Sequence, residues 1–162
     1  MKGRCFVEMD KNKQDKAWGD YEKFKRDYEK SLDENKTFSQ LVVDIMKENN
    51  FTVEKLIEES GLSKATVNRL RSGEVKTWKG EIREYLPHLK TIIAFCIACD
   101  LHILRAITLL ESIGYGFRRT SEVHFAYCHL IVNFRGDSIA KCNEELRKLQ
   151  IDEEYHLGES IK

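Results

Sequence analysis

Proline, long apolar runs and signal sequences are scarce or missing in this chain of 162 residues. The single proline, Pro87, and the rarity of strand-like alternation predict an all-α protein. No apolar run approaches the ~18 residues of a membrane-spanning helix, and the longest, Ile92 to Cys99, suits a buried helix. The amino-terminal residues lack an apolar signal core. We therefore expect a cytoplasmic protein that has no membrane partner and whose five cysteines stay reduced.

Net charge is missing as well, because 27 basic and 27 acidic residues cancel. This balance argues against a protein that coats nucleic acid through bulk electrostatics. Residues 62–80, however, contain five basic residues and one acidic residue, a local charge of +4. Residues 121–162 contain five basic and eight acidic residues, a local charge of −3. A positive face can thus coexist with an acidic carboxyl-terminal part.

Signatures of catalysis are also lacking, because no glycine-rich phosphate loop and no nucleophile elbow is present. We therefore expect neither enzymatic activity nor a cofactor. One set of residues has metal-ligand character, since Cys96 with Cys99 and His124 with Cys128 each share a helix face and together can make a zinc site. Cysteine is among the most buried residue types, so core packing is the preferred interpretation and no metal site is predicted.

The segment from Thr52 to Gly73 is the most informative part of the chain, because it predicts two short helices joined by a glycine turn. Thr52 can cap the first helix with its hydroxyl group. Gly61 follows where the backbone must adopt a left-handed conformation, which glycine does without a steric penalty. Ser63 can then cap the second helix, so the spacing is that of a helix-turn-helix.

The second helix of this segment has one buried stripe, formed by Val67 and Leu70. A helix that merely faces solvent would favour Glu and Lys, whereas this one mixes base-edge readers with phosphate partners, as suits the major groove of DNA. The residues expected to face outward are Lys64, Ala65, Thr66, Asn68, Arg69 and Arg71.

This segment resembles the helix-turn-helix of the XRE family, the phage repressor and Cro type. The chain departs from the family pattern at Val53, where the family has a phosphate-holding glutamine, and at Ile57, where it prefers alanine. The resemblance implies a lambda-repressor-like five-helix DNA-binding domain over residues 38–113. The positions that match the family pattern are Thr52, Leu56, Gly61, Leu62, Ser63, Thr66, Val67, Arg69 and Gly73.

Two further parts flank this domain, an extension over residues 1–37 and a helical hairpin with a short tail over residues 114–162. Residues 1 to about 14 look disordered, and a charged amphipathic helix follows them. Its aromatic face can pack within the chain, which is preferred, or on a second subunit. The hairpin can serve dimerisation, partner docking or core completion. The apolar stripes are Trp18, Tyr21, Phe24, Tyr28 and Leu32 in the extension, Val123, Tyr127, Leu130, Ile131 and Phe134 in the first hairpin helix, and Ile139, Cys142, Leu146 and Leu149 in the second.

Residues 74–86 form a longer connection than usually follows the second helix in this family. Lys76, Trp78 and Lys79 can lie along the DNA backbone there. The competing and preferred interpretation of Trp78 is that it anchors the loop to the core.

These observations predict a sequence-specific transcriptional regulator, in particular a repressor, that binds double-stranded DNA as a homodimer with Ser63–Arg71 in the major groove. The alternative is a protein-interaction module on the same scaffold, such as an antitoxin or anti-regulator, in which DNA binding is secondary or lost. The partner of such a module would bind through the amino-terminal helix or the hairpin. Zero net charge and Val53 slightly favour this alternative. The predicted DNA-binding residues are Thr52, Ser63, Lys64, Ala65, Thr66, Asn68, Arg69, Arg71, Lys76 and Lys79.

Overall fold

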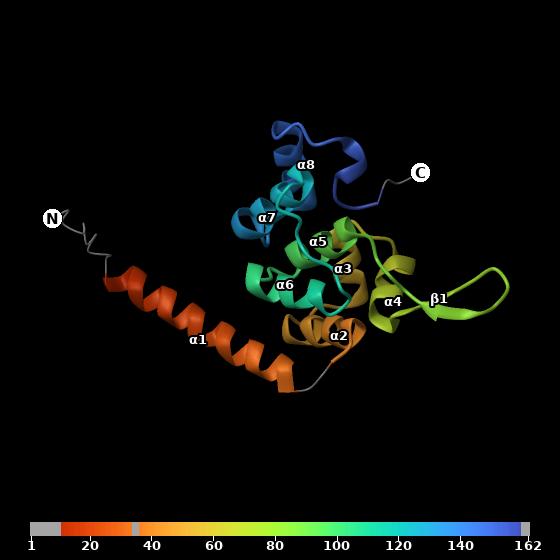
Figure 1. The fold of residues 1–162 in the computed structure, drawn as a ribbon, viewed down its shortest axis with the longest axis horizontal. Helices are drawn as coiled ribbons and strands as arrows, with labels where there is room; N and C mark the ends of the chain where they lie inside the picture. Colours follow the sequence, from red (N-terminus) through yellow and green to blue (C-terminus); the bar gives the residue numbers. More distant parts are fainter. Residues whose placement is uncertain (1–10, 34–35, 160–162) are drawn as a thin grey trace. The chain divides into compact units, whose positions relative to one another are not determined.

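The chain forms two compact units, residues 1–35 and residues 36–162, in a computed structural model that describes residues 11–33 and 36–159 (Figure 1). The first unit contains the single helix α1 (Lys11–Asp33). Its aromatic side chains pair along the helix, with ring centroids 5.6 Å apart for Trp18 and Tyr21 and 5.8 Å apart for Phe24 and Tyr28. The predicted amphipathic helix is present and begins earlier than expected, while residues 1–10 and the side chain of Leu32 lie outside the described residues.

The second unit contains the other helices and one two-stranded sheet. Among the described residues the chain is therefore mainly helical, as the scarcity of proline predicted. The elements are α2 (Phe38–Glu48), α3 (Val53–Ser60), α4 (Lys64–Ser72), β1 (Glu74–Lys76), β2 (Ile82–Glu84), α5 (Leu89–Ala98), α6 (Ile103–Glu111), α7 (Glu122–Phe134), α8 (Ile139–Lys148) and the 3₁₀ turn η1 (Glu153–Tyr155).

Helix α5 is the centre of this unit. Every side chain from Thr91 to Cys99 is buried, so the helix is covered on all sides, as its continuous apolar sequence requires. It packs against α3, α6, α7 and α8. Within the described part of the chain, no helix combines the length and the apolarity needed to cross a membrane.

Helices α7 and α8 form the predicted hairpin. Ser121 and Ser138 cap them by accepting hydrogen bonds from the backbone N–H groups of His124 and Lys141. The apolar face of α7 and the residues Cys142 and Leu146 of α8 are buried in the common core, so the hairpin completes that core. Leu149 was expected to continue the stripe of α8 but is 43% exposed, because the helix has already ended at Lys148.

Residues 74–86 form a β-hairpin rather than an irregular loop. β1 and β2 pair antiparallel with Val75 opposite Arg83, and the Gly80 N–H donates to the Thr77 carbonyl at 2.9 Å in the connecting turn. Trp78 lies in this turn and is 91% exposed, so the interpretation that it anchors the loop to the core is wrong. The hairpin projects away from the helices (Figure 1).

Candidate nucleic-acid interface

Local hydrogen bonds fix the two helices and the turn between them as the sequence predicted. The Thr52 hydroxyl accepts from the Lys55 N–H at 3.1 Å, which caps α3. Gly61 has a φ of +67°, and its N–H donates to the Ile57 carbonyl at 3.1 Å. The Ser63 hydroxyl accepts from the Thr66 N–H at 3.2 Å, which caps α4. The helix-turn-helix predicted from residues 52–73 is confirmed.

Helix α4 is held from behind by its buried stripe. Val67 and Leu70 are 0% exposed, and the helix packs against α2 and α3. Gly73 ends the helix with a φ of +71°, and a Cβ atom there would lie 2.9 Å from Oγ of Ser39. Both the conformation and this close approach require glycine at position 73. The orientation of α4 relative to α2 is therefore well defined.

The other side of α4 carries the residues predicted to face DNA. Lys64 and Asn68 are exposed, and Ala65, Arg69 and Arg71 are exposed with them. The face combines two guanidinium groups, one ammonium group and one amide group, which can donate hydrogen bonds to phosphates or base edges. The outward placement predicted for these five residues is therefore found in the structure.

Thr66 departs from this pattern. It is only 7% exposed, and its hydroxyl donates a hydrogen bond to Oε1 of Glu159, a residue 93 positions later in the chain. The expectation that Thr66 faces outward is therefore wrong. The helical pattern alone could not reveal this, because the covering group comes from the carboxyl-terminal end of the described chain.

Glu159 and its neighbours form a small electrostatic cluster. Burial on its own would raise the pKa of the Glu159 carboxyl, but hydrogen bonds with Thr66 and Ser63 and the charge of Arg69 lower that pKa below its ordinary value of 4.5. Burial raises the pKa of Tyr85; the positive charge of Arg69 opposes this shift, and the negative charge of Glu159 adds to it. Glu159 is therefore a carboxylate at neutral pH, seated at the amino-terminal end of α4.

The β-hairpin adds a second set of cations next to α4. Lys76 and Lys79 are exposed, and Nζ of Lys79 lies 5.1 Å from the centroid of the Trp78 ring. The Tyr85 N–H donates to the Gly73 carbonyl at 2.9 Å, which ties the base of the hairpin to the end of α4. Arg83 pairs opposite Val75 and so lies on the other face of the hairpin from Lys76, where its Nη2 is 3.1 Å from a Glu81 carboxylate oxygen. This placement could not be predicted from the sequence, because the face on which Arg83 lies is set only by strand pairing.

The candidate zinc ligands lie on two helices. Cys96 lies on α5, Cys99 follows the last residue of that helix, and both are buried. Burial raises the pKa of both thiols, that of Cys99 to about 12. On α7, burial and then the charge of Arg118 lower the pKa of His124, and Cys128 is half-buried. Across residues 11–33 and 36–159, no three His, Cys, Asp or Glu side chains are grouped in a way that could hold a metal ion.

Comparison with known protein families agrees with this geometry. Residues 44–82 match the family model of the Cro/C1-type HTH DNA-binding domain. The match starts within α2, includes α3 and α4 and ends at the first residue of β2. The chain thus carries a helix-turn-helix of the XRE type, as its resemblance to that family indicated, and this domain supports a DNA-binding regulator in general terms. No curated protein and no solved structure matches the chain.

Proposed function

We propose that the protein is a sequence-specific transcriptional repressor that binds an inverted repeat in DNA as a homodimer. The observation that carries the proposal is the two-sided character of α4. Val67 and Leu70 fix the helix from behind, while Lys64, Asn68 and Arg71 are exposed within residues 44–82, the segment that matches a DNA-binding domain family. A helix held in this way can enter the major groove without rearrangement of its own backbone.

The side chains of α4 divide by chemistry into base readers and phosphate partners. The amide of Asn68 can pair with the N6 and N7 edge of adenine, and the methyl group of Ala65 can contact a thymine methyl group. Lys64, Arg69 and Arg71 divide between guanine and phosphate. The exposed cap residue Thr52 and the half-buried Ser63 stand at helix amino termini, where phosphates bind well.

The β-hairpin supplies the remaining contacts in this proposal. Lys76 and Lys79 are exposed and follow α4 directly, so they can extend the footprint along the phosphate backbone. Repression is the role that the likeness to phage repressors favours, since a regulator seated on promoter DNA excludes other proteins from the same site.

The test is selection of binding sequences from a random DNA pool with the intact protein. Lys64→Ala combined with Asn68→Ala removes two exposed groups from α4. A matched control, Asn133→Ala with Lys141→Ala, removes the same groups from the exposed positions on α7 and α8. We expect an inverted repeat to be enriched by the wild type and the control and lost in the α4 variant.

A single variant then separates base reading from general affinity. Asn68→Ala should weaken binding to the selected site by about 1–3 kcal/mol but leave binding to random DNA nearly unchanged. Equal losses on both DNAs would refute a base-reading role. If nothing is enriched and the protein also flows through heparin at low salt, the protein-interaction module becomes the better account of the fold.

A further inference from the structure

The chain does not end at the helical hairpin but runs back from α8 toward the helix-turn-helix as a strap, which we define as residues 150–159. Hydrogen bonds anchor its first half to the core. The Tyr127 hydroxyl donates to the Tyr155 carbonyl at 2.7 Å, and Nζ of Lys90 donates to the Glu154 carbonyl at 2.9 Å. The strap is therefore tied to both α7 and α5.

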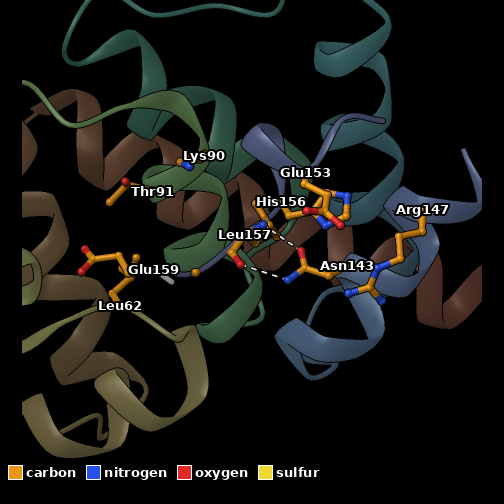
Figure 2. Close-up of a pocket in the computed structure, with 10 residues that line it drawn as sticks. Leu62, Lys90, Thr91, Asn143, Arg147, Glu153, His156, Leu157 and Glu159 are labelled. Atoms are coloured by element: carbon orange, nitrogen blue, oxygen red, sulfur yellow. Dashed lines mark hydrogen bonds between the residues drawn. The ribbon is translucent and has the colours of Figure 1, made fainter. Parts of the chain in front are cut away.

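Asn143 on α8 holds the second half of the strap. Its Oδ1 accepts from the Leu157 N–H at 2.7 Å, and its Nδ2 donates to the Leu157 carbonyl at 3.0 Å (Figure 2). Leu157 itself is 4% exposed. A pocket of about 550 Å³ lies beside this anchor, and Arg147, His156 and Glu159 are among the residues that line it. Two residues beyond Leu157, the strap reaches the turn between α3 and α4.

At that turn the strap and the helix-turn-helix are in backbone contact. The Glu159 N–H donates to the Gly61 carbonyl at 2.8 Å. Gly158 has a φ of +82°, and a Cβ atom there would lie 3.4 Å from the Gly61 carbonyl oxygen. The side chain of Glu159 then lies over the amino-terminal end of α4, where it accepts the hydrogen bond from Thr66.

This end of α4 is a good place for an anion. The helix terminus carries a partial positive charge and backbone N–H groups without helical partners, and the hydroxyls of Ser63 and Thr66 add donors. The charge of Arg69 acts on the same carboxylate. A phosphate of DNA would be recognised by the same donors, so the carboxylate and a phosphate exclude each other.

We propose that the strap is an autoinhibitory element, in which Glu159 occupies as an internal anion the place that a DNA phosphate takes at the amino-terminal end of α4. This inference rests on the proposed function of α4 as the DNA-reading helix. The strap must leave before DNA can engage Ser63 and Thr66. The apparent affinity for DNA is therefore the intrinsic affinity multiplied by the fraction of molecules whose strap is open.

Two variants open the strap in different ways. Glu159→Ala removes the internal anion, and Glu154→Ala is its control, because it removes the same charge from an exposed position of the same strap. Asn143→Ala cuts the anchor of Leu157 and changes no charge. If the strap is closed in nine molecules of ten, each opening variant binds DNA roughly tenfold more tightly than the wild type. The affinity of Glu154→Ala for DNA should stay within about twofold of the wild-type affinity, and this small gain reflects only the loss of one negative charge.

Binding is measured by fluorescence anisotropy on the selected inverted repeat, or on random duplex DNA at low salt, and thermal melting verifies that each variant is folded. Tighter binding by both Glu159→Ala and Asn143→Ala supports the proposal, even where the wild type alone binds too weakly to detect. If the wild type binds DNA and the opening variants bind no better than Glu154→Ala, the strap is not inhibitory and only this inference fails. If no folded variant binds DNA, both this inference and the proposed function fail.

Hydrogen exchange supplies a readout that does not depend on affinity. The Glu159 amide is protected by its bond to the Gly61 carbonyl, and the Leu157 amide by its bond to Asn143. Release of the strap by DNA should speed exchange at Glu159, whereas an amide of α5 should be unchanged. Full protection of Glu159 in a saturated DNA complex would overturn the proposal.

Discussion

The β-hairpin makes the salt dependence of DNA binding a sharp test of the interface. Four of the exposed cations in each protomer are assigned to phosphates, Lys64 and Arg71 on α4 and Lys76 and Lys79 on the hairpin. If all contact phosphates in a dimer, eight contacts at about −0.9 each give a slope of log K against log salt of about −7. The double variant Lys76→Ala with Lys79→Ala removes half of these contacts. Its slope should therefore be about −4.

The assay is fluorescence anisotropy on the selected duplex between about 50 and 200 mM salt, where such slopes are well measured. The matched control is Lys141→Ala with Lys148→Ala, which removes two exposed lysines from α8. The control should keep the wild-type slope. If the hairpin variant keeps it too, Lys76 and Lys79 do not contact DNA. A wild-type slope near −2 would remove the hairpin and part of α4 from the interface.

Three further predictions concern stability and ionisation. Leu70→Ala should lower the free energy of unfolding by about 2–5 kcal/mol in urea titrations, because Leu70 is 0% exposed. The control Leu149→Ala, at a position that is 43% exposed, should change it by less than about 0.5 kcal/mol. Similar losses for the two variants would contradict the packing described. Burial raises the pKa of Cys99 to about 12, so its thiol is neutral at pH 8 and should resist iodoacetamide until the protein is unfolded. Rapid labelling of the native protein would instead show that the side chain is accessible. Because the pKa of Glu159 is lowered, its contact with α4 is fully formed above pH 4.5 and is lost only as the pH falls through the lower pKa of the folded state. An NMR titration of the Glu159 carboxyl with a midpoint at or above 4.5 would contradict that contact.

The helix-turn-helix could be predicted because its signals are local. Thr52, Gly61 and Ser63 each act on backbone groups within four residues, so their positions in the sequence are enough to place the helix ends. Val67 and Leu70 are on one face of a single short helix, and the exposed positions on its other face follow from helical geometry. Lys64, Asn68 and Arg71 were placed correctly for this reason.

The remaining features depend on partners that are distant in the sequence. Thr66 is covered by Glu159, and no periodicity within α4 reports a carboxylate from the strap. The β-hairpin has strands of only three residues each, too short to show an alternating pattern, and its register comes from pairing across the turn. Leu149 fits the apolar period of α8, but the helix stops one residue before it. Tertiary contact, rather than local preference, decides each of these cases.

The burial of α5 on every side has a consequence for the genetics of this protein. Every DNA-facing residue proposed here lies before residue 80, yet α5 needs Tyr127, Leu130 and Cys142 from the hairpin as cover. A stop codon between residues 114 and 140 would spare the whole reading surface and still leave an apolar helix uncovered, which favours aggregation and proteolysis. Nonsense alleles in this region should therefore behave as complete loss of function rather than as shortened proteins that compete for the operator.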